Sequence, residues 1–81
     1  MDSKLVYRTT DLIDCTEATV RHDPSRRAFS CSLLDLNNGN FIRTIVIHYD
    51  DTLPGMGRDA SLTLAVQKVQ HWTTPVTVGG N

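Results

Sequence analysis

Residues 28–49 read AFSCSLLDLNNGNFIRTIVIHY, and this stretch decides the fold. Two runs rich in apolar and β-branched residues flank an asparagine-rich segment, a pattern typical of a β-hairpin. We expect Asn38 and Gly39 to form a two-residue type I′ turn, because both central positions of that turn need a positive φ. In the resulting register Leu34 faces Arg43, and Ala28 faces Tyr49.

Both faces of the hairpin are apolar in this register. A ribbon with one solvated face alternates more strictly between apolar and polar residues. We therefore expect one face to lie under a helix, and the other to be covered by the N-terminal segment or by a partner. The first face holds Leu34, Phe41, Arg43, Ile45 and Tyr49, and the second holds Phe29, Cys31, Leu33, Ile42, Val46 and His48.

Upstream of the hairpin, Lys4–Arg8 predicts a short strand and residues 16–22 predict a half-buried one, because apolar and polar residues alternate there. The turn between them is polar, and we expect Leu12 and Ile13 to point inward from it. Asp23-Pro24-Ser25 predicts the next turn, since proline presets φ for the second turn position.

Downstream of the hairpin, an apolar stripe at helical spacing predicts an amphipathic helix with Asp59 or Ser61 as its N-cap. The stripe consists of Leu62, Ala65, Val66, Val69 and Trp72, and Leu64 points away from it. Pro75–Val78 can add an edge strand. The sequence thus predicts an α+β fold: an antiparallel β-sheet of three to five strands with one C-terminal amphipathic helix on one face, in a single domain covering residues 1–81.

Composition narrows the class of protein. Hydrophobic residues make up 40% of the 81 residues and charged residues 21%, which is typical of a globular domain. The N-terminus has no apolar signal region, and Cys15 and Cys31 are too few for a disulfide framework, so we expect a cytoplasmic protein with reduced thiols. The formal net charge of −1 does not favour nucleic-acid binding, in which phosphate contacts supply most of the affinity.

The segment PGMGRDA, residues 54–60, fits a variant of the dinucleotide-binding fingerprint. That fingerprint works within a βαβ unit, and no such unit follows here, while Asp50 and Asp51 would repel a pyrophosphate. We interpret Gly55 and Gly57 as parts of a connector to the helix. Anion binding through the helix N-terminus and Arg58 is the alternative.

Cysteine and histidine spacings do not match a metal site, so we predict no metal and no cofactor. In the expected register, Cys31 and His48 share one hairpin face and are close enough to touch. Their apolar neighbours Phe29, Leu33 and Val46 indicate that this face is packed in an apolar environment, which does not favour a reactive thiolate. We therefore expect a protein that is not an enzyme.

The function that explains the doubly apolar hairpin is recognition of another protein, or of a second copy as a homodimer. We expect a small inhibitor or adaptor, a class that includes proteins encoded by phages and mobile elements, with no membrane partner. The expected contact residues are Leu34, Phe41, Arg43, Ile45 and Tyr49, or else the second hairpin face, together with Leu64 and Arg58. Two alternatives remain: a nucleic-acid-binding regulator using Arg21, Arg26, Arg27 and Arg43, and a small enzyme or anion-binding protein using the Gly55–Gly57 loop.

Overall fold

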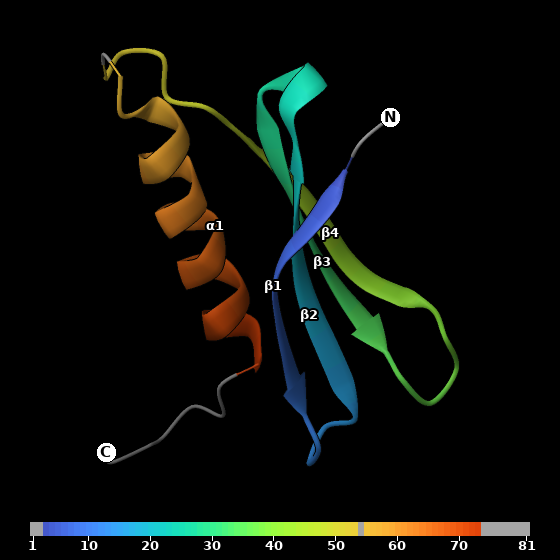
Figure 1. The fold of residues 1–81 in the computed structure, drawn as a ribbon. Coiled ribbons are helices and arrows are strands. Elements are labelled where there is room, and N and C mark those ends of the chain that lie inside the picture. Colours follow the sequence, from blue (N-terminus) through green and yellow to red (C-terminus); the bar gives the residue numbers. More distant parts are fainter. Residues whose placement is uncertain (1–2, 54, 74–81) are drawn as a thin grey trace, which may run out of the picture.

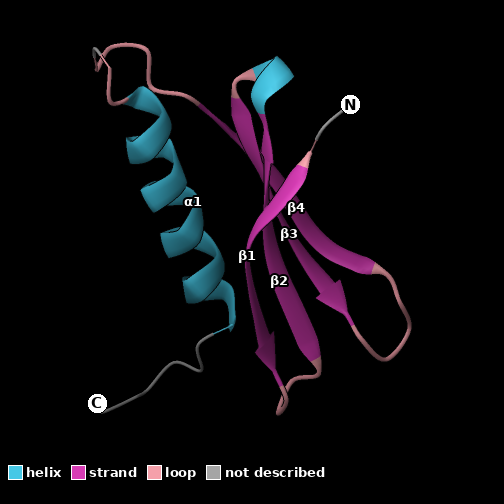
Figure 2. Ribbon diagram, viewed as in Figure 1, coloured by secondary structure: helices cyan, strands magenta, loops and turns pink. Residues whose placement is uncertain are grey.

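A computed structural model of the chain describes residues 3–53 and 55–73. The strand predicted at Pro75–Val78 lies outside these residues. Four antiparallel strands form one sheet in the order of the sequence, and a single α-helix follows them (Figures 1 and 2). The elements are β1 (Lys4–Asp11), β2 (Thr16–Asp23), a short 3₁₀ turn (Pro24–Arg26), β3 (Ala28–Asp35), β4 (Phe41–His48) and α1 (Gly57–Thr73).

The predicted α+β class and the single helix packed on one face of an antiparallel sheet are confirmed. Helix α1 lies on one side of the sheet, and the other side carries no described element (Figure 1). The helix packs mainly over β2 and β3 and least over β4. The described part of the chain is therefore a two-layer structure with one covered and one open sheet face.

The core lies between α1 and the covered face of the sheet. Alternate residues of β2 and β3 point toward the helix, as the strand pleat requires. The predicted helical stripe supplies the opposing side, although Val66 is only half-buried. The buried apolar cluster consists of Ala18, Val20, Phe29, Cys31, Ala65 and Val69, with Tyr7, Leu33, Ile45, Ile47, Tyr49, Leu62 and Trp72 packed around it.

The predicted register of the β3–β4 hairpin is wrong by one residue. Cys31 pairs with Ile45 and Leu33 pairs with Arg43, whereas a two-residue turn would pair Leu34 with Arg43. A slip of one residue moves the side chains of one strand to the opposite face. Ile45 and Ile47 consequently join Cys31 on the covered face, and the open face of the hairpin mixes Leu34, Phe41 and Val46 with polar residues.

Side chains of the hairpin loop explain the register. The Asp35 carboxylate accepts a hydrogen bond from the Asn37 N–H (2.8 Å), and the Asn38 side chain accepts one from the Asn40 N–H (2.8 Å). Each of these hydrogen bonds closes a short turn, and together the two turns form a hairpin loop longer than two residues. Gly39 in this loop has a φ of 76°. Pairing resumes where the Asp35 N–H donates to the Asn40 carbonyl (2.9 Å).

In the observed register the open face is largely polar. One row across the sheet runs from Arg8 to Thr19, Ser32 and Thr44, because these residues are register partners in successive strands. Such a face can stay in contact with water.

The junction between β4 and α1 depends on Ser61 and Gly57. The Ser61 hydroxyl is 1% exposed; it accepts a hydrogen bond from the Asp50 N–H (3.1 Å) and lies 3.0 Å from the His48 carbonyl and 2.7 Å from the Gly57 carbonyl. A Cβ on residue 57 would come within 2.9 Å of the Asp50 carbonyl carbon, so only glycine fits there without a backbone shift. The strand end and the helix start are held in direct contact.

This contact corrects the predicted helix start. The helix begins at Gly57, and the Ala60 N–H already donates to the Met56 carbonyl (3.0 Å). Asp59 therefore lies in the first turn, where its carboxylate interacts favourably with the positive end of the helix dipole. Ser61 lies inside the helix. Neither residue is the N-cap.

Replacing Ser61 with alanine should lower the free energy of unfolding by about 1 to 3 kcal/mol, because hydrogen bonds at a buried junction are lost. Chemical denaturation measures the change. Thr63→Ala is the matched control: Thr63 is exposed on the same helix, and its replacement should change stability by less than about 0.5 kcal/mol. Equal effects of the two substitutions would contradict this role of Ser61.

Burial of Cys31 makes the stability of the fold decrease at high pH. Its side chain is fully buried, and burial raises the pKa of the thiol to about 11, above its ordinary value of 9.0. A raised pKa in the folded state means that the thiol contributes fully to stability below about pH 9, and that this contribution is lost as pH rises through 11.

Between pH 9 and pH 11 the wild-type protein should therefore lose about 2 kcal/mol more unfolding free energy than the Cys31→Ala variant. Urea unfolding of both proteins at the two pH values measures this difference. The variant itself controls for titration of lysines and tyrosines, which both proteins share. Parallel pH profiles would contradict the assignment.

Candidate functional site

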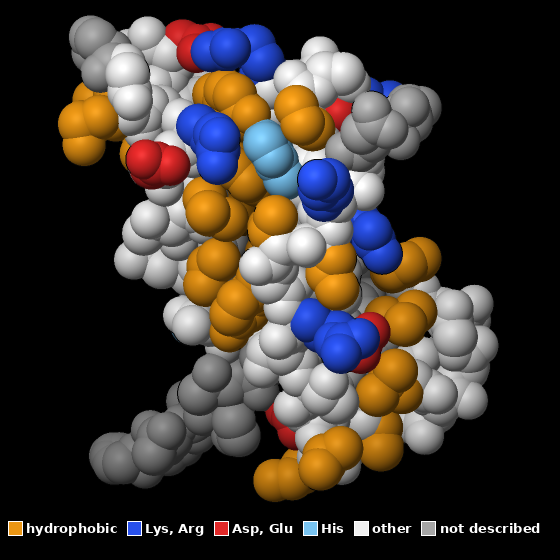
Figure 3. All heavy atoms as spheres, viewed as in Figure 1, with side chains coloured by type: hydrophobic (Ala, Val, Ile, Leu, Met, Phe, Trp, Pro, Cys, Tyr) orange, Lys and Arg blue, Asp and Glu red, His pale blue; other side chains and the backbone are white. Residues whose placement is uncertain are grey.

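Exposed large hydrophobic side chains gather at one end of the sheet. The β1–β2 turn and the β3–β4 loop lie at this end, and both carry such residues (Figure 1). In Figure 3 hydrophobic side chains reach the surface at the lower end and lower right of the molecule. We call this surface the apolar end; it consists of Leu12 (83% exposed), Ile13 (84%), Leu36 (44%), Phe41 (66%) and Ile42 (57%).

The prediction that Leu12 and Ile13 point inward is wrong. The physical reason is the Asp11 side chain, which is almost buried and occupies the inner side of the turn. Its Oδ1 accepts hydrogen bonds from the Ile13 N–H (2.9 Å) and the Asp14 N–H (3.1 Å). Cys15 completes the turn with a φ of 55° in the left-handed region, so the two aliphatic side chains point into solvent.

The two loops of the apolar end are joined by a backbone hydrogen bond. The Leu36 N–H donates to the Cys15 carbonyl (2.9 Å), which holds the β3–β4 loop against the β1–β2 turn. Because each loop is also closed by an aspartate side chain, Asp11 or Asp35, the apolar residues are carried on a hydrogen-bonded frame. The surface is thus assembled from two segments that are distant in sequence.

Sequence reasoning missed Leu12, Ile13 and Leu36, and it placed Ile42 only on the second hairpin face. A usable signal is the segment Asp-Leu-Ile-Asp at 11–14, because aspartate often accepts hydrogen bonds from the backbone two residues later and thereby forms a turn. In such a turn the central side chains point outward. Leu36 carried no comparable signal, since its exposure depends on the length of the hairpin loop.

The structure divides the residues that the sequence predicted as one contact surface. Leu34 pairs with Phe41 on the open face of the sheet, whereas Ile45 and Tyr49 pack against the core under the helix. Arg43 also lies on the covered side, with its guanidinium 5.3 Å from the Trp72 ring centroid. The last two predicted residues are exposed on α1: Leu64, 44% exposed as expected, and Arg58 in the first turn. Of the predicted set, only Phe41 belongs to the apolar end.

The four arginines of the nucleic-acid alternative are not brought together. Arg21 lies in the row that connects Leu5, Ser30 and Val46 on the open face. Arg26 forms an ion pair with Asp23 (3.5 Å), and Arg27 forms one with Asp51. With Arg43 held over Trp72, these side chains point to different surfaces, and two of them are neutralised by carboxylates.

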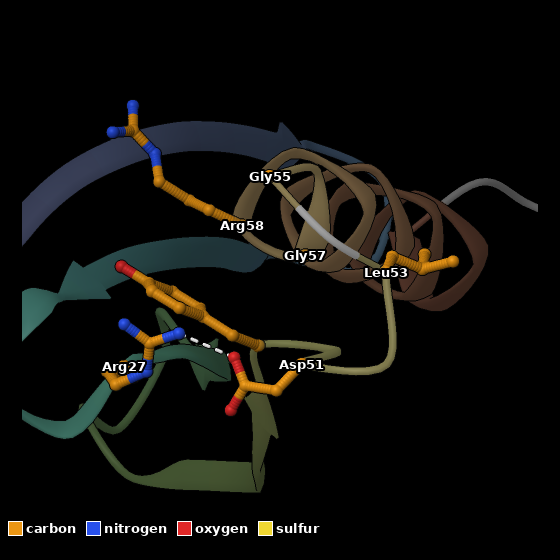
Figure 4. A pocket seen from close by; sticks show the side chains of 7 residues that line it. Arg27, Asp51, Leu53, Gly55, Gly57 and Arg58 are labelled. Carbon is orange, nitrogen blue, oxygen red and sulfur yellow. Dashed lines mark hydrogen bonds and ion pairs between the residues drawn. The ribbon is translucent and has the colours of Figure 1, made fainter.

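The Gly55–Gly57 loop borders a pocket of about 260 Å³ at the opposite end of the sheet from the apolar end. Figure 4 shows Arg27 directed at Asp51 and Arg58 extending separately from the start of the helix. The pocket is lined by Arg27, Tyr49, Asp51, Leu53, Gly55, Gly57 and Arg58. Its glycines have structural reasons: the close approach of Gly57 to Asp50 and the φ of 74° at Gly55.

The predicted proximity of Cys31 and His48 is wrong, again because of the register. Cys31 faces the helix, and His48 pairs with Ala28 on the open side. A different histidine, His22, stacks on Phe29 (4.7 Å between ring centroids) and hydrogen-bonds to the Tyr49 hydroxyl. This aromatic group closes the core near the pocket.

Comparison with known proteins finds no matching family model, no similar curated protein and no similar solved structure. Within residues 3–53 and 55–73, no helix is long and apolar enough to span a membrane.

Replacing Asp11 with alanine should lower the free energy of unfolding by about 1 to 3 kcal/mol, because the Ile13 and Asp14 N–H groups lose their acceptor. Amide exchange at these two residues should become faster as the turn opens. Asp14→Ala is the control, since Asp14 is exposed and its side chain does not close the turn. Unchanged exchange in the Asp11 variant would show that another contact holds the turn.

Proposed function

We propose that this protein is a non-enzymatic protein-binding module that contacts its partner through the apolar end. The observation that carries the proposal is the exposure of five large hydrophobic residues, between 44% and 84% each, on the β1–β2 turn, the β3–β4 loop and the first two residues of β4. Small globular proteins rarely expose such groups together unless the surface binds something. The class of function is the one expected from the sequence, whereas the proposed contact surface is the sheet end in place of the hairpin faces.

The construction of the loops supports a binding role. Leu12 and Ile13 add little to the core because they are more than four-fifths exposed, and yet the buried Asp11 side chain holds their turn in place. Phe41 supplies an aromatic side chain, the type that contributes strongly at protein interfaces. Burial of one such aliphatic or aromatic side chain by a partner is worth about 1.5 to 3 kcal/mol.

Charges near the apolar end favour a protein over an anionic partner. Asp14 is exposed beside Ile13, and Asp35 is half-buried at the start of the loop that carries Leu36. These carboxylates repel nucleic-acid phosphates and anionic lipid headgroups. They suit an apolar groove bordered by basic side chains, which is the partner chemistry we propose.

The double substitution Leu12→Ser and Ile13→Ser should reduce partner capture at least tenfold, because two buried side chains are lost from the contact. The tagged protein is used to capture partners from the source cells, and bound proteins are quantified by mass spectrometry. Stability should change by less than about 0.5 kcal/mol, since both positions are exposed. Denaturation of the variant checks this expectation.

Leu64→Ser is the matched control, because Leu64 is an exposed leucine on α1 and belongs to neither loop of the apolar end. It should capture the same partners as the wild type. Equal capture by the double variant and the wild type would overturn the proposal. Flotation with neutral phosphatidylcholine vesicles that depends on Leu12 and Ile13 would assign the surface to lipid instead.

A further inference from the structure

Among the residues that the structure describes, strand β4 is an edge of the sheet, and half of its backbone groups face outward. The Tyr49 N–H donates to the Arg27 carbonyl (2.9 Å), so position 49 bonds toward β3. Hydrogen-bonding direction alternates along a strand of an antiparallel pair. Ile45 and Ile47 therefore bond inward as well, and the N–H and C=O groups of Thr44, Val46 and His48 point to the outer side of the sheet.

The two edges of the sheet differ in their protection. Natural edge strands avoid pairing with other chains through charges, prolines and bulges. β1 has such features, namely Lys4, Arg8 and a register shift between Leu5 and Tyr7. The β4 segment TIVIH, residues 44–48, has no proline and no Lys, Arg, Asp or Glu, and the guanidinium of neighbouring Arg43 is held over Trp72.

We propose that β4 of one protomer pairs antiparallel with β4 of a second copy, about a two-fold axis at Val46, to form a continuous eight-stranded sheet. In this register Val46 faces its own counterpart, and Thr44 faces His48 of the second copy, so outward-pointing backbone groups meet outward-pointing groups. Ile45 faces Ile47 of the second copy on the covered side. None of these residue pairs between the two β4 strands brings two like charges together.

The residues on the covered side of β4 support a second copy of the protein as the partner that pairs with this edge. Ile45 and Ile47 are only half-buried, because α1 packs least over β4. A second β4 places the same two isoleucines beside them, between the two helices, and so extends the core across the interface. The partner strand must be extended, uncharged and β-branched, and residues 44–48 are themselves such a strand.

This inference concerns a different surface from the apolar end and can fail separately from the proposed function. Sedimentation equilibrium from low micromolar to near-millimolar concentration measures the mass. The wild type should reach twice the chain mass. Val46→Lys should weaken association on the order of 100-fold, because two lysines then face each other at the axis.

Val6→Lys is the matched control: Val6 and Val46 are valines of similar exposure, 44% and 49%, on opposite edges of the sheet. This variant should associate as the wild type does. A wild type that stays monomeric throughout the concentration range overturns the proposal, and so does a Val46→Lys variant that associates as strongly as Val6→Lys.

Amide hydrogen exchange of the wild type tests the geometry without any substitution. The N–H groups of Thr44, Val46 and His48 should exchange more slowly as concentration rises, while the N–H groups of Ile45 and Ile47 are already bonded within one protomer. A dimer in which the exchange of the three outward groups does not change with concentration would place the interface elsewhere and overturn the proposal.

Discussion

The buried hydroxyl of Ser61 joins the end of β4 to the start of α1, and the two-layer arrangement depends on this junction. The hydroxyl contacts the backbone of three residues, His48, Asp50 and Gly57. The absence of a side chain at Gly57 allows the helix to begin directly against the strand end. With its origin fixed there, α1 runs back across β2 and β3, where Ala65 and Val69 meet the sheet. The glycine segment that resembles a nucleotide-binding loop is thus explained by packing.

The elements could be predicted from the sequence, whereas their exact register could not. Alternation in residues 16–22 and the helical spacing from Leu62 to Trp72 reflect which side chains must be buried, and burial dominates the choice of strand or helix. The hairpin register was decided by smaller energies. Side-chain hydrogen bonds from Asp35 and Asn38 stabilised a longer loop than the Asn38-Gly39 pair predicts. That single difference exchanged the faces of β4 and moved the candidate site. A similar side-chain contact, from Asp11 to the turn backbone, leaves Leu12 and Ile13 exposed, and the sequence pattern did not reveal it.

The corrected register separates the surfaces by chemistry. The open sheet face is mostly polar, the edge of β4 is uncharged, and five exposed hydrophobic residues gather at the apolar end. The proposed dimer would place these features in a definite relation. Because paired β4 strands run in opposite directions, the two apolar ends would lie at opposite ends of the joined sheets. One dimer could then bind two partners, or two copies of a repeated partner, with an avidity that a single module lacks.

The turn closed by Asp11 has a consequence for the energetics of recognition. Ordering a flexible loop at the moment of binding costs free energy, which reduces the affinity that apolar contacts can provide. Here the backbone of residues 11–15 is already ordered by the carboxylate and by the link from Leu36 to Cys15. The entropy of the turn is lost when the chain folds and not when a partner arrives. In the proposed complex, Leu12 and Ile13 would therefore be preorganised for contact, and their contribution to affinity would depend mainly on how well the opposing groove fits them.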